Sequence, residues 1–227
     1  MNWKVTIKLD LKDLAFLNSL WRNWSIKPPL FLRLVFPGTA WQEKVTEKKV
    51  FLTFDDGPIP QVTPWVINCL KEHGMVATFF CVGDNIRKHP DVFQQLRDNG
   101  MGIGNHTYSH KKAWRSSKAD YLLDVDLYSD YYRANIFRPP HGQLYPWWIK
   151  DLKKRFSKIV MWDILTMDYD VKLGANDIVN NVINNVRSGS IIVFHDSIKS
   201  MPRLQSALPI VLDWIKKEGY KSALFSS

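Results

Sequence analysis

The chain has 227 residues, of which 45% are hydrophobic and 13% aromatic, enough to bury the core of one α/β domain with a short extension. Its formal net charge of +9 favours anionic partners, but the Lys and Arg residues are scattered without a nucleic-acid motif, so we expect no nucleic acid partner. Two cysteines, Cys69 and Cys81, are too few for a disulfide framework and are expected to be buried free thiols.

Residues 1–48 form a predicted N-terminal extension. Charged side chains interrupt its first part, namely Lys8, Asp10, Lys12 and Asp13. This part lacks the unbroken apolar core of a signal peptide, and no segment is long enough for a membrane span, so we expect a cytoplasmic or peripherally membrane-associated protein. Residues 26–41, IKPPLFLRLVFPGTAW, are basic, aromatic and apolar. They are interpreted either as a cover packed against the domain or as a segment lying on a membrane surface.

From residue 49 onward, short apolar runs alternate with segments whose apolar residues recur every three or four positions. This pattern is typical of parallel strands joined by crossover helices. The predicted strands span 49–54, 76–82, 101–105, 135–138, 158–162, 190–195 and 220–225. The predicted helices span 61–74, 89–100, 117–133, 145–156, 175–189 and 204–219. Seven strands with six helices and short connections predict a closed or nearly closed (β/α) barrel.

Ionisable residues stand at the carboxyl ends of five predicted strands. They are Asp55, Asp56, His106, Arg138, Asp163, His195 and Asp196. Taken singly, each is more often a turn residue, a helix cap or a satisfied core residue. In a parallel β/α barrel, however, these strand ends meet at one rim, where catalytic groups gather. The set therefore predicts a catalytic site on that rim.

The sequence NHTYSH places His106 and His110 four residues apart, a spacing that lets one turn or tight loop direct both imidazoles at one ion. Alone, the spacing is more typical of unrelated surface histidines. With the carboxylate of Asp56 it becomes the two-His, one-carboxylate set of a hydrolytic zinc site with an open position for water. A metal there would offset the repulsion between adjacent carboxylates and leave Asp55 ionised to take a proton from the bound water.

Five motifs in order, TFDDGP, HTYSH, RPPHG, WDILTMDYD and IIVFHD, resemble those of the NodB-homology polysaccharide deacetylases, the family-four carbohydrate esterases. The resemblance covers roughly residues 49–224, and it implies that residues 49–227 are the catalytic domain. It implies a distorted (β/α) barrel with about seven parallel strands. The implied reaction is metal-dependent removal of an acetyl group from an N-acetylated or O-acetylated oligosaccharide or polysaccharide.

The resemblance also assigns roles to individual residues. It makes Asp55 the general base and His195 the general acid, with one divalent metal on Asp56, His106 and His110. Arg138 would orient Asp55 and keep it ionised. Asp168 would pair with His195 and raise its pKa, and the backbone N–H of His141 would stabilise the oxyanion. Zinc is the expected metal by ligand type, and cobalt or nickel would fit the same ligands.

Four positions depart from the family pattern. Tyr169 replaces a common Trp, Leu165 a common Asp, Val193 a Leu, and His141 an aromatic Tyr or Phe. We expect Tyr169 to keep a wall of the substrate groove, and Val193 to leave a slightly larger apolar pocket beside the acetyl methyl. The sequence leaves the glycan open among peptidoglycan, chitin-like oligomers, acetylated xylan and a lipid-linked sugar. Two alternative functions remain open. The protein could be a metal-dependent hydrolase of a non-carbohydrate amide, or a non-catalytic glycan-binding module.

Four tryptophans are candidates for stacking against a sugar ring, although large aromatic side chains in a domain of this size are more often core or interface residues. They are Trp114, Trp147, Trp148 and Trp162.

Overall fold

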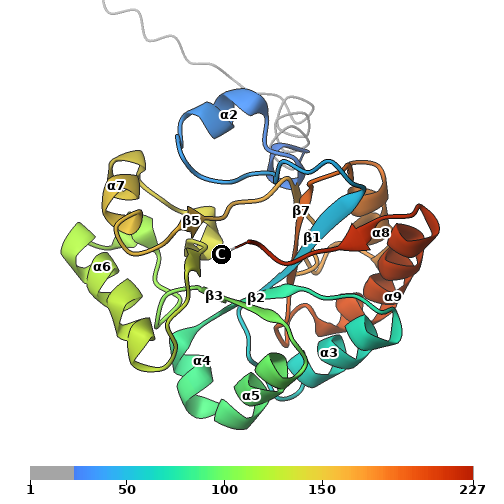
Figure 1. Ribbon diagram of the computed structural model, residues 1–227, viewed down its shortest axis with the longest axis horizontal. Coiled ribbons are helices and arrows are strands. Elements are labelled where there is room, and N and C mark those ends of the chain that lie inside the picture. The colour runs from blue at the N-terminus through green and yellow to red at the C-terminus, as the bar shows by residue number, and fades with distance from the viewer. Residues whose placement is uncertain (1–22, 227) are drawn as a thin grey trace, which may run out of the picture.

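A single curled sheet of parallel strands, surrounded by helices, forms the body of the molecule in the computed structural model, which describes residues 23–226 (Figure 1). The strands are β1 (Lys49–Asp55), β2 (Thr78–Cys81), β3 (Gly102–Asn105), β4 (Ile136–Phe137), β5 (Lys158–Ile159), β6 (Ile164–Leu165), β7 (Ile191–His195) and β8 (Lys221–Ser222). Their order is β5-β4-β3-β2-β1-β7-β6, and β8 pairs with the start of β1. The predicted distorted barrel is confirmed.

Helices cover the outer side of this sheet (Figure 1). They are α3 (Thr63–Glu72), α4 (Gly83–Lys88), α5 (Pro90–Asp98), α6 (Lys118–Leu127), α7 (Ile149–Leu152), α8 (Ala175–Ile183) and α9 (Met201–Lys217). The short α2 (Leu30–Leu34) precedes them and has no buried residue. Five of the six predicted helical segments each contain one of these helices, and α9 begins at Met201, three residues before the predicted segment 204–219. The segment 145–156 holds only the short α7, because Pro146 and the two following residues form a 3-10 turn first. α4 was not predicted, since six residues are too few to show a helical period.

β1 is the central strand, and it is buried along nearly its whole length. The Phe54 ring stacks on Phe79 of β2 and on Phe194 of β7, with centroids 5.0 and 5.5 Å away. Such continuous apolar character is expected for a parallel strand covered on both faces. The parallel register places the last residue of β1, Asp55, directly beside His195.

The stretch 158–165 passes from one edge of the sheet to the other. β5 pairs with β4, β6 pairs with β7, and only residues 160–163 separate them. The single predicted strand over 158–162 is therefore wrong in extent. Asp163 does not join the rim either: its N–H donates to the carbonyl of Ile191, the first residue of β7. The change of partner strand leaves no trace in the apolar pattern, so the sequence alone could not reveal it.

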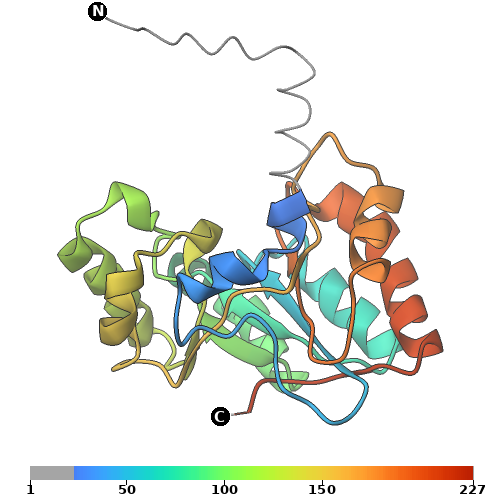
Figure 2. The same ribbon diagram turned by 90° about the horizontal axis from the view of Figure 1, so that it is seen from above.

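Residues of the predicted N-terminal extension pair with the sheet where its edges approach each other. Ala40 forms a bridge with Val160, and Gln42 forms one with Ser190. Figure 2 shows the chain between α2 and β1 passing along this side of the molecule. Gln42 Nε2 also donates to the carbonyl of Ser188 at 2.8 Å. The division of the chain at residue 49 stays a prediction, as does its location in the cell, and residues 1–22 lie outside the described part. Within residues 23–226, no helix has the length and apolar character needed to cross a bilayer.

Candidate metal centre and active site

The turn after β1 fixes the two adjacent carboxylates. Asp56 adopts φ +86°, and the N–H of the following Gly57 donates to Asp196 Oδ1 at 3.0 Å. A side chain at Gly57 would overlap the Asp196 carboxylate, so only glycine fits there. Asp196 is itself held by the Thr63 hydroxyl at 2.6 Å, and burial raises its pKa to about 8. The turn thus places Asp55 and Asp56 against different partners, Arg138 for Asp55 and His110 for Asp56.

Asp56, His106 and His110, the metal donors expected from the sequence, lie close enough together that they could hold one metal ion. One donor atom from each lies within 4.8 Å of the others, and Asp56 Oδ1 is 3.2 Å from His110 Nε2 and 3.9 Å from His106 Nε2. His106 Nδ1 lies 2.8 Å from the carbonyl of Arg138. Because a carbonyl only accepts, Nδ1 carries the proton and the Nε2 lone pair faces the site. The donor set fits one divalent metal.

The loop that carries both histidines is fixed by buried polar contacts. Asn105 Oδ1 accepts from the N–H of Thr107 at 2.7 Å, and Asp124 accepts from the N–H and the hydroxyl of Ser109. Thr107 and His110 both have positive φ, which lets a short loop return the second imidazole to the first. Contacts of this kind orient the two imidazoles toward Asp56.

The electrostatics of the group favour a cation. Burial opposes ionisation of Asp56, but the hydrogen bond from His110 and the charge of His195 outweigh it and hold the pKa of Asp56 well below its usual range. Burial also lowers the pKa of His106 to about 4. Near neutral pH the site therefore presents an ionised carboxylate and a neutral imidazole, the protonation states that metal binding requires.

Asp55 is held by a buried arginine. Arg138 Nη1 donates to Asp55 Oδ1 at 2.6 Å, and its remaining donors reach Thr53 Oγ1 and the carbonyls of Val160 and Met161. The guanidinium also lies 4.1 Å from the centre of the Phe80 ring. Asp55 Oδ2 is the oxygen left on the side of the metal group, 4.0 Å from His106 Nε2. This leaves one carboxylate oxygen available for proton transfer.

His195 is held by Asp168 in two places. Its Nδ1 lies 2.7 Å from Asp168 Oδ1, and its backbone N–H donates to Oδ2 at 2.8 Å. Burial disfavours the imidazolium, but the charge of Asp168 outweighs that effect and raises the pKa of His195 to about 9. Arg203 in turn donates to the carbonyl of Asp168. The pair therefore keeps a proton on His195 at neutral pH.

One cavity of about 560 Å³ is lined by Asp55, Asp56, His106, His110, Arg138 and His195, whereas Asp168 and Asp196 are buried behind this lining. Its walls include the predicted groove residues His141, Tyr169 and Val193. Burial, together with the adjacent His110, lowers the pKa of His141 to about 4, and the Tyr169 ring lies edge-on to His195 at 5.0 Å. Val193 pairs across the sheet with Leu165, so the two make one apolar patch in the wall.

Comparison with known proteins identifies the family to which this chain belongs. The sequence model described as polysaccharide deacetylase matches residues 42–155, half of the chain. The chain belongs to the polysaccharide deacetylase family. This confirms the resemblance found in the motifs, and the protein is accordingly a carbohydrate deacetylase, a hydrolase.

Relatives of this deacetylase agree in sequence and fold. A peptidoglycan-N-acetylglucosamine deacetylase from Bacillus cereus is 33% identical over 188 residues, covering 80% of this chain and 88% of the relative. A chitooligosaccharide deacetylase from Azorhizobium caulinodans is 31% identical, covering 70% and 79%. The crystal structure of the Bc1960 peptidoglycan N-acetylglucosamine deacetylase superposes with a TM-score of 0.75 at 28% identity, covering 86% of this chain and 92% of that one.

Several residues of the candidate site could not be assigned from the sequence. The sequence indicates Asp196 only as a strand-end residue, although its position next to His195 is a usable signal. Ser25 lines the cavity, and its carbonyl accepts from Trp162 Nε1 at 3.0 Å. No pattern in the N-terminal extension indicated this contact. Of the four tryptophans considered as sugar-stacking residues, only Trp162 lines this cavity; Trp148 is buried, and Trp114 and Trp147 are exposed.

Proposed function

We propose that this deacetylase removes N-linked acetyl groups from an N-acetylhexosamine-containing glycan, with Asp55 as general base and His195 as general acid. One observation carries the proposal: a single cavity holds an Arg-oriented carboxylate, an Asp-paired imidazole and a group of three metal donors. A base and an acid with separately tuned surroundings are what amide hydrolysis needs.

Asp56, His106 and His110 would hold the metal. Two imidazoles and one carboxylate favour zinc, and cobalt or nickel suits the same donors. When bound, the metal polarises the acetyl carbonyl and lowers the pKa of water at its open position. His106 is prepared for this role by the carbonyl of Arg138, which fixes its tautomer.

The two titrating residues then divide the proton transfers. Asp55 Oδ2 accepts the proton of the attacking water, while Arg138 keeps Oδ1 engaged. His195 donates from Nε2 to the departing amine, because Asp168 occupies Nδ1. The N–H of His141 supports the oxyanion: within residues 23–226 it has no acceptor, and it belongs to a tight turn whose φ of 59° is left-handed.

The wall of the cavity supports an acetylated sugar as the substrate. The apolar patch of Leu165 and Val193 suits an acetyl methyl group, and the rings of Tyr169 and Trp162 suit the face of a hexose. The relatives named above act on N-acetylglucosamine in peptidoglycan and on chitooligosaccharide. An N-acetylhexosamine is the element that these substrates share.

The test is acetate release by the metal-loaded protein from N-acetylated and O-acetylated oligosaccharides. Asp55→Asn should lose turnover by about a hundredfold or more while still binding metal. Asp91→Asn, which alters a surface carboxylate on α5, is the matched control and should be unaffected. Near-full activity of Asp55→Asn would refute the base assignment. Metal binding without acetate release from any glycan would favour a non-carbohydrate amide as substrate or a glycan-binding role.

A further inference from the structure

α2 and the residue that follows it expose an apolar ridge, in which the Phe31 ring also meets the Trp24 ring edge-on at 5.5 Å. Leu30, Phe31, Leu34 and Val35 are 74, 57, 79 and 50% exposed, and α2 has no buried residue. We call these four residues the α2 ridge. Four large apolar side chains gathered on one short element are unusual on a protein surface, where exposed apolar residues are normally scattered singly. The ridge therefore needs a partner.

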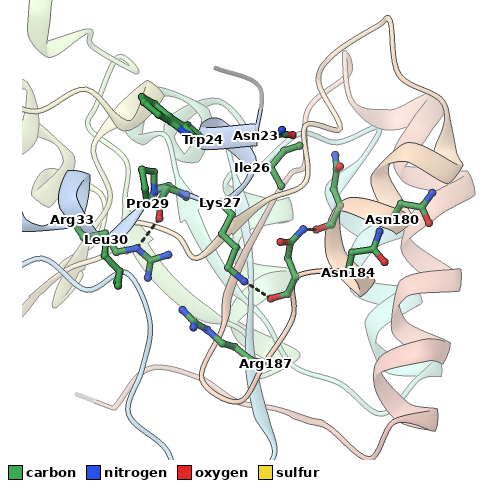
Figure 3. Close-up of a pocket in the computed structure, with 13 residues that line it drawn as sticks. Asn23, Trp24, Ile26, Lys27, Pro29, Leu30, Arg33, Asn180, Asn184 and Arg187 are labelled. Carbon is green, nitrogen blue, oxygen red and sulfur yellow. Dashed lines mark hydrogen bonds between the residues drawn. The ribbon is translucent and has the colours of Figure 1, made fainter. Parts of the chain in front are cut away.

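A second cavity, of about 600 Å³, lies between the N-terminal segment and α8 (Figure 3). We call it the basic cavity, because Lys27, Arg33 and Arg187 line it. Leu30 lines it as well, so the ridge and the basic cavity are continuous. It is distinct from the active-site cavity, since no residue lines both.

The basic cavity has uncompensated positive charge. Arg33 and Arg187 both donate to Asp163 Oδ1, at 2.7 and 3.1 Å, and the Ser190 hydroxyl donates to Oδ2. Lys27 reaches across to the turn after α8 and donates to the carbonyl of Asn185 at 2.8 Å. Figure 3 draws this hydrogen bond of Lys27 as a dashed line. Two arginines thus share one buried carboxylate, Lys27 bonds a neutral carbonyl, and no acidic residue among residues 23–226 lines the cavity, so positive charge is in excess there.

Hydrogen-bond donors also remain available beside these charges. The Arg187 side chain is 48% exposed, and Nη2 alone of its nitrogens is bonded within residues 23–226. The side-chain amides of Asn180 and Asn184, on the α8 side of the cavity, have no hydrogen-bond partner in that same range (Figure 3). Guanidinium and amide N–H groups around a cationic space are suited to phosphate oxygens.

We propose that the α2 ridge and the basic cavity together dock this protein on the surface of a membrane that contains anionic phospholipid. The ridge would enter the interface, and a lipid phosphate would occupy the basic cavity beside Leu30. Charge complementarity selects this partner: residues 23–42 contain Lys27 and Arg33 but no Asp or Glu. Apolar side chains next to basic ones are the combination that holds a helix in the plane of an anionic bilayer.

Docking would bring the active site to the membrane. Ser25 lines the active-site cavity, whereas the neighbouring Ile26 and Lys27 line the basic cavity. One short segment therefore forms part of both walls. If the proposed function holds, the substrate class is an acetylated sugar presented at a membrane surface, such as one carried on a lipid.

Vesicle flotation of the full-length protein tests the docking. Phosphatidylcholine vesicles with and without phosphatidylglycerol are compared, using wild type, Leu30→Ser/Leu34→Ser and Arg187→Gln. We expect binding only to the anionic vesicles, weakened at least about tenfold by the double ridge variant and about fivefold by Arg187→Gln. Leu123→Ser on α6 and Lys154→Gln after α7 are matched surface controls and should bind like wild type. Urea unfolding checks that each variant is folded.

Three outcomes would overturn the docking proposal. They are no binding to anionic vesicles, equal binding by ridge variants and controls, and a wild-type dimer that the ridge variants convert to monomer, since a second copy would then cover the ridge. Acetate release from a soluble acetylated oligosaccharide is measured in parallel. We expect it to be unchanged in the ridge variants. If wild type binds vesicles but releases no acetate, the proposed function is contradicted and the docking proposal is not.

Discussion

Replacing Asp168 by Asn should remove the proton that His195 holds at neutral pH. The carboxylate contacts both Nδ1 and the backbone N–H of His195, and its charge is the main influence that overcomes the cost of burying an imidazolium. Asparagine keeps the size but not the charge, and its NH₂ group cannot accept a hydrogen bond. With burial then unopposed by Asp168, the pKa of His195 should fall from about 9 to below its ordinary 6.5.

The contribution of His195 to the free energy of unfolding follows from its pKa values in the folded and unfolded states. A pKa of about 9 in the folded state against 6.5 in the unfolded state corresponds to about 3 kcal/mol. Because the folded-state pKa is raised, this stabilisation is fully present below pH 6.5 and is lost as the pH rises to 9 and above. The difference in unfolding free energy between wild type and Asp168→Asn should therefore be at least about 3 kcal/mol larger at pH 6 than at pH 9.5.

The assay uses protein freed of metal, so that no cation affects the titration. Histidine ring resonances give the pKa of His195, and urea unfolding at several pH values gives the free energies. Asp170→Asn changes a nearby carboxylate that accepts from the N–H of Lys172, and it should leave the His195 titration nearly unchanged. A His195 pKa that stays near 9 in Asp168→Asn, or a stability difference that does not vary with pH, would refute the reasoning.

Three further substitutions test other contacts. His106→Ala removes one of three metal donors and should weaken zinc affinity more than about a hundredfold by isothermal titration, since loss of an outer-shell contact alone costs up to that much; unchanged affinity would exclude the site. Arg138→Met leaves Asp55 buried without its cation and should cost about 3–5 kcal/mol in urea unfolding; a cost under 1 kcal/mol would contradict this. Gly57→Ala should lower the free energy of unfolding by about 1–3 kcal/mol, because the added methyl group overlaps Asp196. Gly174→Ala is the control, since a methyl group there would lie 3.8 Å from Asp177 Oδ2, its nearest neighbour outside the adjacent residues.

The strand ends could be predicted because local pattern and chemistry coincide there. Apolar runs such as 49–54 stop where ionisable residues begin, and parallel topology brings those ends to one rim. Asp55, Asp56 and His106 all lie in the cavity that this geometry predicts. Short-range sequence information was sufficient for them, because Asp55 ends β1 while Asp56 and His106 directly follow β1 and β3.

Other features depend on contacts that no local pattern records. Asp163 follows an apolar run just as the rim residues do, yet it is a buried partner of Arg33 and Arg187, because its strand changes neighbours midway. Ser25 joins the active-site wall through Trp162, which is 137 positions away. In both cases tertiary pairing decides the position, and periodicity contains no information about it.

The central position of β1 has a consequence for how the enzyme is made. On a ribosome, β1, β2 and β3 can pair once residue 105 has emerged, but the other edge of β1 has no partner until residues 191–195 follow. A growing chain therefore contains all three metal-donor residues long before His195. During that interval it also offers an unpaired, strongly apolar strand edge to neighbouring chains. Protection of that edge during translation is a requirement that the finished barrel conceals.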